Sequence, residues 1–200
     1  MWIIENLGII DYQEAYSYQK KLVELKQGGE GNNFFLLLEH PPVFTRGKGA
    51  KAENILDKNI PIHTISRGGD LTCHEPGQLV GYIILDLLKE KLTAKKFINK
   101  IEDLIIDSLK ETAIDACKSP QSPGVWLKGK KIASIGIGIK KGVTMHGFAI
   151  NINNNLEGFK KINPCGIKSE NYSSLKNLTG KSVSLDEIRR IIIEDFKNKF

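Results

Sequence analysis

The residues best suited to chemistry in this sequence are a cysteine and a lysine that lie far apart along the chain. Cys165 stands between Pro164 and Gly166, which favour a tight, exposed bend. An accessible thiol becomes nucleophilic when a nearby base or cation stabilises its thiolate. Lys131 begins an apolar stretch, where a lysine gives up its proton more easily and can act as a general base. Each residue alone also fits a plainer interpretation, a loop cysteine or a turn lysine pointing to water.

A glycine-rich stretch, RGGDLTCHEPGQLVGY at residues 67–82, could form a ligand pocket. Its glycines allow the backbone to approach a ligand closely, and Arg67, Thr72 and His74 supply polar groups. The spacing matches neither a dinucleotide-binding nor a P-loop motif, and a strand rather than a helix is expected to follow. The alternative is a glycine-rich loop with a solvated arginine.

The remaining cysteines and histidines do not predict a metal or cofactor site. Cys117 ends a helical pattern and is expected in the core, and the Cys73–His74 pair has no further ligands near it in the sequence. His40, His63 and His146 are scattered, which is typical of hydrogen-bonded structural residues. The glycines of residues 131–151 fail the G-x-G-x-x-G test, so neither a nicotinamide nor a flavin site is expected.

Periodicity predicts the elements that must hold these groups. Apolar residues at helical spacing predict helices over 11–26, from Thr93 onward, and after Ser184, where Glu187 completes a capping-box pattern. Short apolar runs predict strands over 34–39, 60–66 and 78–87. Residues 124–127, 131–139 and 143–153, separated by Lys-Gly turns, predict a three-stranded antiparallel meander.

Length and composition favour one α/β domain over residues 1–200, since 40% of the residues are hydrophobic and 26% are charged. The net charge of +6 favours an acidic partner, although it also fits a basic surface that keeps the protein in solution. Three widely spaced cysteines predict no disulfide framework. No membrane span or signal peptide is evident, which predicts a soluble, cytoplasmic protein.

Five ordered motifs together resemble the octanoyltransferase family, the lipoyl(octanoyl) transferases of lipoate biosynthesis. They are LEHPPVFTRG at 38–47, RGGDLTCHEPGQLVGY at 67–82, GVWLKGKKIASIGIGI at 124–139, HGFAININ at 146–153 and NPCGI at 163–167. The resemblance spans nearly the whole chain. It implies an α/β (α+β) fold with a mixed, largely antiparallel sheet and outer helices, similar to biotin and lipoate protein ligases.

The resemblance also implies roles for individual residues. The acyl-thioester nucleophile falls on Cys165, and the lysine that favours ionisation of this thiol and serves as general acid and base falls on Lys131. The substrate pocket is expected to comprise Arg67, Gly68, Gly69, Asp70, Leu71, Thr72, Cys73, His74, Ser134, Ile135, Gly136, Gly147, Phe148 and Ala149.

The reaction implied is transfer of an octanoyl group from octanoyl-acyl carrier protein to a lysine of an apo-lipoyl domain, in 2-oxoacid dehydrogenases or the glycine cleavage H protein. A thioester donor is already activated, so no cofactor, ATP or metal is expected. Neither a nucleic-acid nor a membrane partner is expected. An acidic carrier protein would account for the basic net charge.

The sequence departs from the family pattern at four positions of the glycine-rich stretch and the strand after it. Asp70 replaces a common glutamine, Cys73 an aromatic, Glu75 a glycine and Ile83 a proline. Glu75 is expected beside the pocket entrance, where it could alter acyl preference or carrier docking, and Cys73 could add a competing thiol.

Three other functions remain open at this point. An ATP-dependent lipoate or biotin protein ligase would share the fold but activate a free acid, and an amidotransferase would take lipoyl groups from protein. The third is a basic RNA-binding module, although the sequence has no arginine-rich or aromatic-interleaved face.

Overall fold

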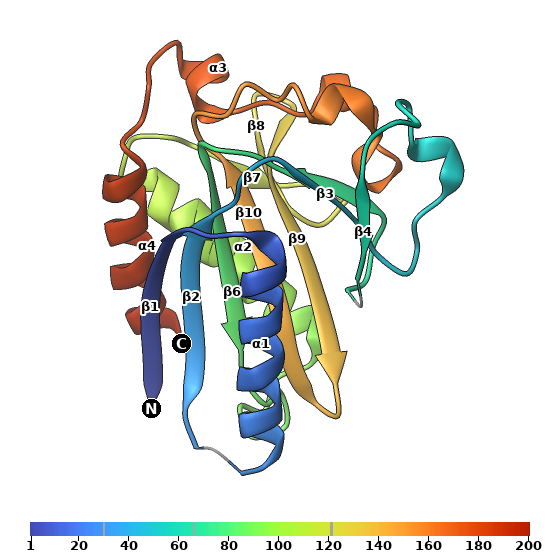
Figure 1. The fold of residues 1–200 in the computed structure, drawn as a ribbon. Coiled ribbons are helices and arrows are strands. Elements are labelled where there is room, and N and C mark those ends of the chain that lie inside the picture. The colour runs from blue at the N-terminus through green and yellow to red at the C-terminus, as the bar shows by residue number, and fades with distance from the viewer. Residues whose placement is uncertain (30, 66, 121) are drawn as a thin grey trace.

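A seven-stranded sheet forms the centre of the computed structural model, which describes residues 1–29, 31–65, 67–120 and 122–200 (Figure 1). The strand order is β1-β2-β6-β10-β9-β8-β7. Strands β1 and β2 pair in parallel and all other neighbours are antiparallel, as a mixed, largely antiparallel sheet requires. The bounds are β1 (Trp2–Ile9), β2 (Asn33–Glu39), β6 (Gln78–Ile84), β7 (Cys117–Lys118), β8 (Val125–Leu127), β9 (Lys130–Lys140) and β10 (Val143–Asn151).

A second, three-stranded sheet of order β4-β3-β5 lies at one end of the large one (Figure 1). Its strands are β3 (Val43–Arg46), β4 (Ile62–Thr64) and β5 (Leu71–His74). An apolar cluster that includes Phe44, Leu71 and Phe159 joins it to the segment that carries Cys165. Short 3-10 helices complete this end of the molecule: η1 (Ala52–Asn54), η2 (Phe159–Lys161), η3 (Pro164–Gly166) and η4 (Ser169–Asn171).

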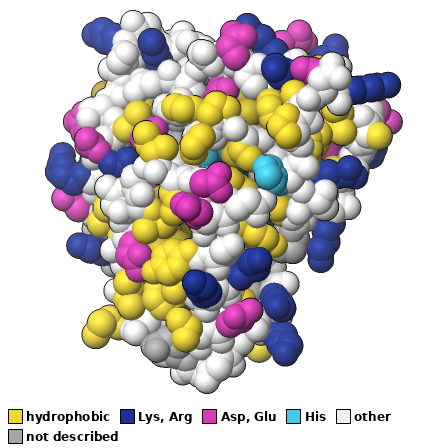
Figure 2. All heavy atoms as spheres, viewed as in Figure 1, with side chains coloured by type: hydrophobic (Ala, Val, Ile, Leu, Met, Phe, Trp, Pro, Cys, Tyr) yellow, Lys and Arg dark blue, Asp and Glu magenta, His cyan; other side chains and the backbone are white. Residues whose placement is uncertain are grey.

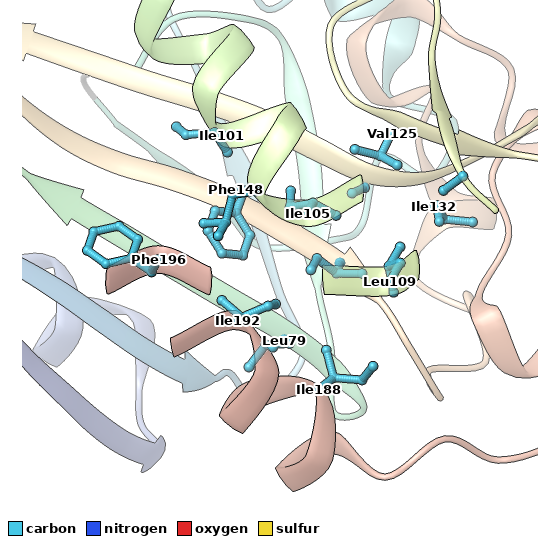
Figure 3. Close-up of a cluster of buried hydrophobic side chains, with 14 of the residues drawn as sticks. Leu79, Ile101, Ile105, Leu109, Val125, Ile132, Phe148, Ile188, Ile192 and Phe196 are labelled. Carbon is cyan, nitrogen blue, oxygen red and sulfur yellow. The ribbon is translucent and has the colours of Figure 1, made fainter. Parts of the chain in front are cut away.

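Helices cover both faces of the large sheet. Helix α1 (Tyr12–Gln27) packs on one face, while α2 (Ala94–Lys110) and α4 (Leu185–Lys199) pack together on the other; α3 (Leu175–Thr179) is a short turn before α4. Strand β2 is therefore buried on both sides, with Leu36 toward α1 and Phe35 toward α2 and α4 (Figure 3 shows the latter core). A strand buried on both faces needs a continuous apolar run, which explains its sequence.

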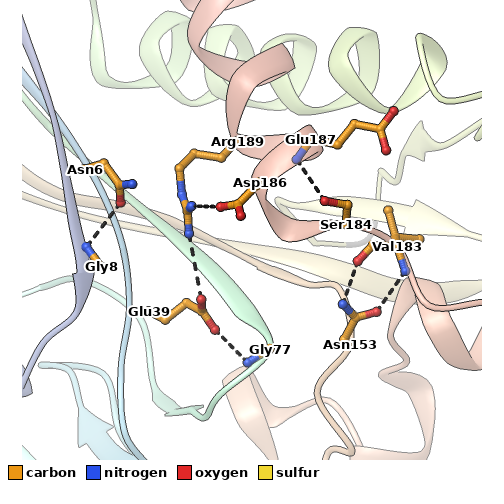
Figure 4. Close-up of polar contacts among 10 residues, drawn as sticks. All are labelled: Asn6, Gly8, Glu39, Gly77, Asn153, Val183, Ser184, Asp186, Glu187 and Arg189. Carbon is orange, nitrogen blue, oxygen red and sulfur yellow. Dashed lines mark hydrogen bonds and ion pairs between the residues drawn. The ribbon is translucent and has the colours of Figure 1, made fainter.

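Side-chain caps fix the starts of the three long helices. Asp11 accepts hydrogen bonds from the backbone of Gln13 and Glu14, Thr93 caps α2, and Ser184 accepts one from Glu187 N at 3.2 Å (Figure 4). Polar contacts also tie α4 and the chain before it to the sheet. Arg189 lies 3.8 Å from Glu39, which accepts a hydrogen bond from Gly77 N, and Asn153 pairs with the backbone of Val183 (Figure 4).

The predicted strands are confirmed, with shorter bounds in places. The predicted meander consists of β8, β9 and β10. The strand predicted over 78–87 ends at Ile84. The strand predicted over 60–66 covers 62–64, and Ser66 lies outside the described residues. Strands β1, β3, β5 and β7 were not predicted. Cys117 was expected in the core but is exposed, because α2 ends at Lys110 and the chain turns into edge strand β7.

Within the described ranges, none of the helices combines the length and apolar character needed to cross a bilayer.

Candidate active site

A pocket opens where the first turn of α1 meets β5, β6, β9 and β10. Its cavity volume is about 50 Å³, and more of its wall is apolar than polar. Its lining residues are Tyr12, Ile65, Arg67, Thr72, His74, Tyr82, Ser134, Ile135, Gly136, His146, Gly147, Phe148, Ala149 and Cys165.

Most of the residues predicted for a substrate pocket lie in this wall. Strands β9 and β10 pair there, with Ser134 opposite Ala149 and Ile135 opposite Phe148. The Phe148 ring lies against Gly81 of β6, where a Cβ would be 2.3 Å from the ring. Glycine at that position therefore makes room for the aromatic side of the pocket. The predicted residues that line it are Arg67, Thr72, His74, Ser134, Ile135, Gly136, Gly147, Phe148 and Ala149.

Leu71 and Cys73 were predicted in the pocket but do not line it. Successive side chains of a strand point to opposite faces, so Thr72 and His74 of β5 face the pocket while Leu71 and Cys73 face the apolar cluster around Phe159. The same alternation separates Cys73 from His74, so the pair cannot bind one metal ion. No group of three or more potential metal ligands occurs among the described residues.

Gly68, Gly69 and Asp70 also lie outside the pocket wall. Gly68 N donates to the Ile137 carbonyl at 3.1 Å, which ties the glycine-rich turn to β9. Gly69 and Asp70 line a second groove instead. The buried Asp70 carboxylate accepts hydrogen bonds from the backbone N–H groups of Lys51 and Leu71 and from the Asn54 amide, so it organises the 47–54 loop.

Cys165 sits between the pocket and this second groove and lines both of them. Its side chain is exposed, and its backbone has φ 56° and ψ 28°, the left-handed conformation that residues other than glycine rarely adopt. The surroundings hold this bend: the Tyr172 hydroxyl donates to the Pro164 carbonyl at 3.0 Å, and Asn163 N donates to the Asn54 carbonyl at 2.8 Å. Such enforced conformations cluster at functional sites.

Lys131 is buried rather than a turn lysine pointing to water. Only 2% of its surface is exposed, and its Nζ donates to Ser122 Oγ at 2.9 Å. The rings of Trp126 and Tyr172 flank it, each with its centroid 5.9 Å from Nζ. Burial lowers the pKa of Lys131, because the charged ammonium loses its hydration, while nearby Cys165 and Glu102 raise it.

The fold thus brings Lys131 and Cys165 into the same electrostatic environment. A bridge between Lys131 and Tyr172, with Ser173 N donating to the Lys131 carbonyl at 3.1 Å, ties the start of β9 to the segment after Cys165. Arg67 faces the same thiol: burial lowers the pKa of this guanidinium, and Cys165 raises it. Lys131 and Arg67 are therefore the two basic side chains that interact electrostatically with Cys165 in the described structure.

Tyr12, Tyr82 and His146 line the pocket but were not predicted there, and they lie close to the predicted His74 and to His40. Tyr12 stands 5.3 Å from His40 and 6.3 Å from His74, measured between ring centroids, and Tyr82 stands 6.0 Å from His146. These three histidines come from three different segments of the chain, so the sequence does not show that they lie near one another. Only the position of Tyr12 on the buried face of α1, and of Tyr82 within the 67–82 motif, offered a signal in the sequence.

Hydrogen bonds fix the tautomers of two of these histidines. His40 Nδ1 is 2.7 Å from the Ile10 carbonyl and must donate to it, so Nε2 accepts from the Tyr82 hydroxyl at 2.8 Å. His74 Nδ1 likewise donates to Gln78 Oε1 at 2.6 Å. Burial lowers the pKa of His74 to about 3, and the same cause lowers the pKa of His146 to about 3. Both rings are thus neutral at pH 7.

These neutral histidines predict a pH-dependent stability. Unfolding frees His74 and His146 to bind protons near pH 6.5, so between pH 6.5 and 3 the unfolded state holds more protons and the folded state is destabilised as the pH falls. At pH 5 each contributes a loss of about 2 kcal/mol relative to pH 7. Urea unfolding at pH 5, 6 and 7 should show this fall, and His74→Gln and His146→Gln should each flatten the slope. An unchanged slope in both variants would contradict it.

Glu75 was expected beside the pocket entrance, but it lies elsewhere and has a structural role. Its buried carboxylate accepts hydrogen bonds from Leu156 N at 2.7 Å, Asn154 Nδ2 at 3.0 Å and Gly158 N at 3.1 Å. It therefore fixes the loop that follows β10. Cys73 packs against the same loop, only 1% exposed, and burial strongly raises its pKa, so a competing thiol at this position is not accessible.

Comparison with known proteins identifies relatives along nearly the whole chain. The family model described as the lipoyl protein ligase A/B catalytic domain matches residues 11–197. An octanoyltransferase of Geotalea uraniireducens is 42% identical over 200 residues, which cover 98% of this chain and 94% of the relative. An octanoyltransferase of Alkaliphilus metalliredigens is 38% identical, with 98% and 94% covered.

Solved structures show the same fold at low sequence identity. A lipoate-protein ligase A bound with ATP superposes with a TM-score of 0.77 at 17% identity, covering 99% of this chain and 84% of that one. A biotin protein ligase from Aquifex aeolicus in complex with biotin and ATP gives a TM-score of 0.58 at 16% identity, covering 99% and 69%. The predicted likeness to biotin and lipoate protein ligases is therefore confirmed for the fold.

Proposed function

The chain belongs to the lipoyl protein ligase A/B catalytic domain family, and from that membership we propose a covalent route for its reaction. Identity of about 40% with octanoyltransferases over nearly the full length makes it an acyltransferase that transfers octanoyl groups in protein lipoylation. In the proposed route octanoyl-acyl carrier protein is the donor. The acceptor is a lysine of an apo-lipoyl domain, such as those of 2-oxoacid dehydrogenases or the glycine cleavage H protein.

One observation carries the proposal: an exposed thiol at the mouth of a largely apolar pocket lies in the electrostatic field of a buried lysine. The pocket would hold the octanoyl chain, since each buried methylene contributes about 0.8 kcal/mol. The groove on the other side of Cys165 leaves its sulfur open to a second reactant while the chain is bound.

In the first half-reaction Lys131 accepts the proton of the Cys165 thiol, and the thiolate attacks the carbonyl carbon of the donor thioester. The tetrahedral intermediate collapses as the carrier thiol leaves, taking the proton back from Lys131. One thioester replaces another, so the step needs no energy source. Burial lowers the pKa of Lys131 toward neutral pH. A general acid and base is most effective when its pKa lies near the working pH, because it can then both accept and return the proton.

In the second half-reaction the neutral amine of the acceptor lysine attacks the Cys165 thioester. An amide forms, the Cys165 thiolate leaves, and Lys131 relays the proton lost by the amine. Since an amide is more stable than a thioester, this step drives the transfer forward. Arg67, which donates to the Thr45 and Gly68 carbonyls and lies beside Cys165, adds positive charge where the oxyanion and thiolate develop.

The charge distribution supports a protein partner of acidic character. The net charge is +6, although the groove beside Cys165 carries both Lys51 and the acidic Glu53 and Asp70. On the face shown in Figure 2 the basic side chains are interspersed with acidic ones and do not form a continuous stripe. This pattern fits electrostatic steering of a folded acidic carrier better than a track along a nucleic-acid backbone.

The test is to incubate the protein with octanoyl-acyl carrier protein in the absence of ATP and to record its intact mass. One hydroxylamine-labile octanoyl adduct is expected, and peptide mapping should assign it to Cys165. The exposed Cys117 provides an internal control for non-specific acylation. An adduct on Cys117 or Cys73 would overturn the site assignment.

The choice of donor separates the related activities in the same experiment. Strict dependence on ATP with free octanoate or lipoate would establish a ligase, and transfer from lipoylated protein but not from carrier protein would establish an amidotransferase. Salt-sensitive RNA binding without acyl transfer would contradict the proposed route.

A further inference from the structure

Glu102 of α2 carries a buried carboxylate that acts on Lys131 but does not line the substrate pocket. The helical pattern predicts that Lys and Glu residues of this segment face solvent, but Glu102 is only 5% exposed, next to the fully buried Ile101. An ionised side chain is costly to bury unless its charge and hydrogen-bonding capacity are met. The contacts that Glu102 makes should therefore account for its burial.

One carboxylate oxygen of Glu102 holds the chain before β8. Oε1 accepts a hydrogen bond from Gly124 N at 2.8 Å. The other oxygen, Oε2, is 3.8 Å from Lys118 Nζ, but that ammonium makes a shorter contact, 2.7 Å, with the exposed Asp103. Lys118 thus compensates Glu102 only in part.

The backbone that Glu102 anchors lies directly against the proposed base. Gly124 has φ 132°, and a Cβ there would be 2.7 Å from Lys131 Cε and 3.3 Å from its Nζ. Ser122, two residues earlier, accepts the hydrogen bond of the same ammonium. Only a glycine leaves room for the lysine stem at this point, so the position of Lys131 depends on the path of residues 122–124.

We propose that Glu102 is a positioning residue for acyl transfer, which fixes the 122–124 segment over Lys131 and places a negative charge behind the ammonium. The inference rests on the role proposed above for Lys131 and Cys165. Helix α2 does not contribute to the pocket wall, but through Glu102 it would affect the proton transfer carried out by Lys131.

Among the described residues, the charged groups that act on Lys131 are Glu102 of α2 and Cys165 of η3. Tyr172, Trp126 and Ser122 also contact its side chain. Burial lowers the pKa of Lys131, and Cys165 and Glu102 both raise it. Loss of the Glu102 charge should therefore release the Lys131 proton at lower pH.

The test compares Glu102→Gln with Asp103→Asn in single-turnover acylation by octanoyl-acyl carrier protein across pH 5 to 10. Glutamine keeps the acceptor for Gly124 N but removes the charge. The pH profile of Glu102→Gln should move to lower pH by roughly half to one unit, because a nearby negative charge favours the protonated form of every group that it reaches. Asp103→Asn removes the adjacent, exposed charge and should leave the profile in place.

A second variant isolates the anchoring role. Glu102→Ala removes the acceptor as well as the charge, so it should show the same shift and a fall of at least about tenfold in the maximal acylation rate. A Glu102→Gln profile that coincides with that of the wild type would overturn the proposal, whether or not the alanine variant folds. Failure of the wild type to form an adduct on Cys165 is a separate outcome, since it would instead remove the proposed covalent route.

Discussion

Replacing Cys165 with serine should lower the turnover of octanoyl transfer by about 10³-fold or more. The reason is that loss of the nucleophile removes the covalent route. The serine hydroxyl ionises far less readily than a thiol, so the buried Lys131 cannot generate a comparable nucleophile from it. Steady-state transfer to an apo-lipoyl domain and the intact-mass adduct should disappear together. The overall fold should persist, because residue 165 is exposed.

The other two cysteines provide matched controls for this substitution. Cys117→Ser changes an exposed thiol on edge strand β7 and should leave both transfer and stability unchanged. Cys73→Ser places a hydroxyl in an apolar cluster, which should cost about 1–3 kcal/mol of stability while the adduct on Cys165 still forms. Retention of an adduct in Cys165→Ser would show that another nucleophile carries the acyl group.

Replacing Lys131 with methionine should lower the rate of Cys165 acylation by about 10² to 10⁴-fold, the range typical for loss of general acid–base catalysis. Methionine has a similar length and no charge, so it can fill the space beside Gly124 and between the rings of Trp126 and Tyr172. Relief of the buried lysine charge opposes the loss of the Ser122 hydrogen bond and of the interaction with Glu102, so the unfolding free energy should change by less than about 2 kcal/mol. A large loss of rate in a variant that stays folded identifies a catalytic role.

Lys130→Met is the matched control for this prediction. Lys130 is the neighbouring residue of β9, and its Nζ donates to the Glu170 carbonyl at 2.9 Å on the surface of the molecule. Its removal should change the acylation rate by less than about threefold and the unfolding free energy by less than about 0.5 kcal/mol. Equal losses of rate in the two variants would indicate a general effect of charge on carrier docking. Rapid-quench acylation and thermal melts of both variants measure the difference.

Glu102 and Asp103 are neighbours on α2, yet only Glu102 is buried. The helical period of this segment predicts that its charged side chains face solvent. The carboxylate of Asp103 is half exposed, but that of Glu102 is buried beneath Gly124. A segment distant in sequence covers it, and a periodic pattern within one helix carries no information about such a segment.

The sequence alone determined the parts of this protein that depend on neighbouring residues. Helix caps at Asp11, Thr93 and Ser184 act within one turn, and the β8-β9-β10 meander follows from alternating runs separated by glycine turns, so these elements were predictable. The bend at Cys165 follows in the same way from the flanking Pro164 and Gly166. The five ordered motifs also indicated the family, and with it the roles expected for Cys165 and Lys131.

Which of these groups face one another depends on how the elements pack together. Strand β1 depends on its parallel pairing with β2, and the register of β5 with β3 sets which face of β5 meets the pocket. Three separate segments bring His40, His74 and His146 near one another. The shared environment of Lys131 and Cys165 likewise arises where β9 meets Tyr172. Such contacts depend on how whole elements pack across the sheet, and the free energy of that packing is not encoded in any single local pattern.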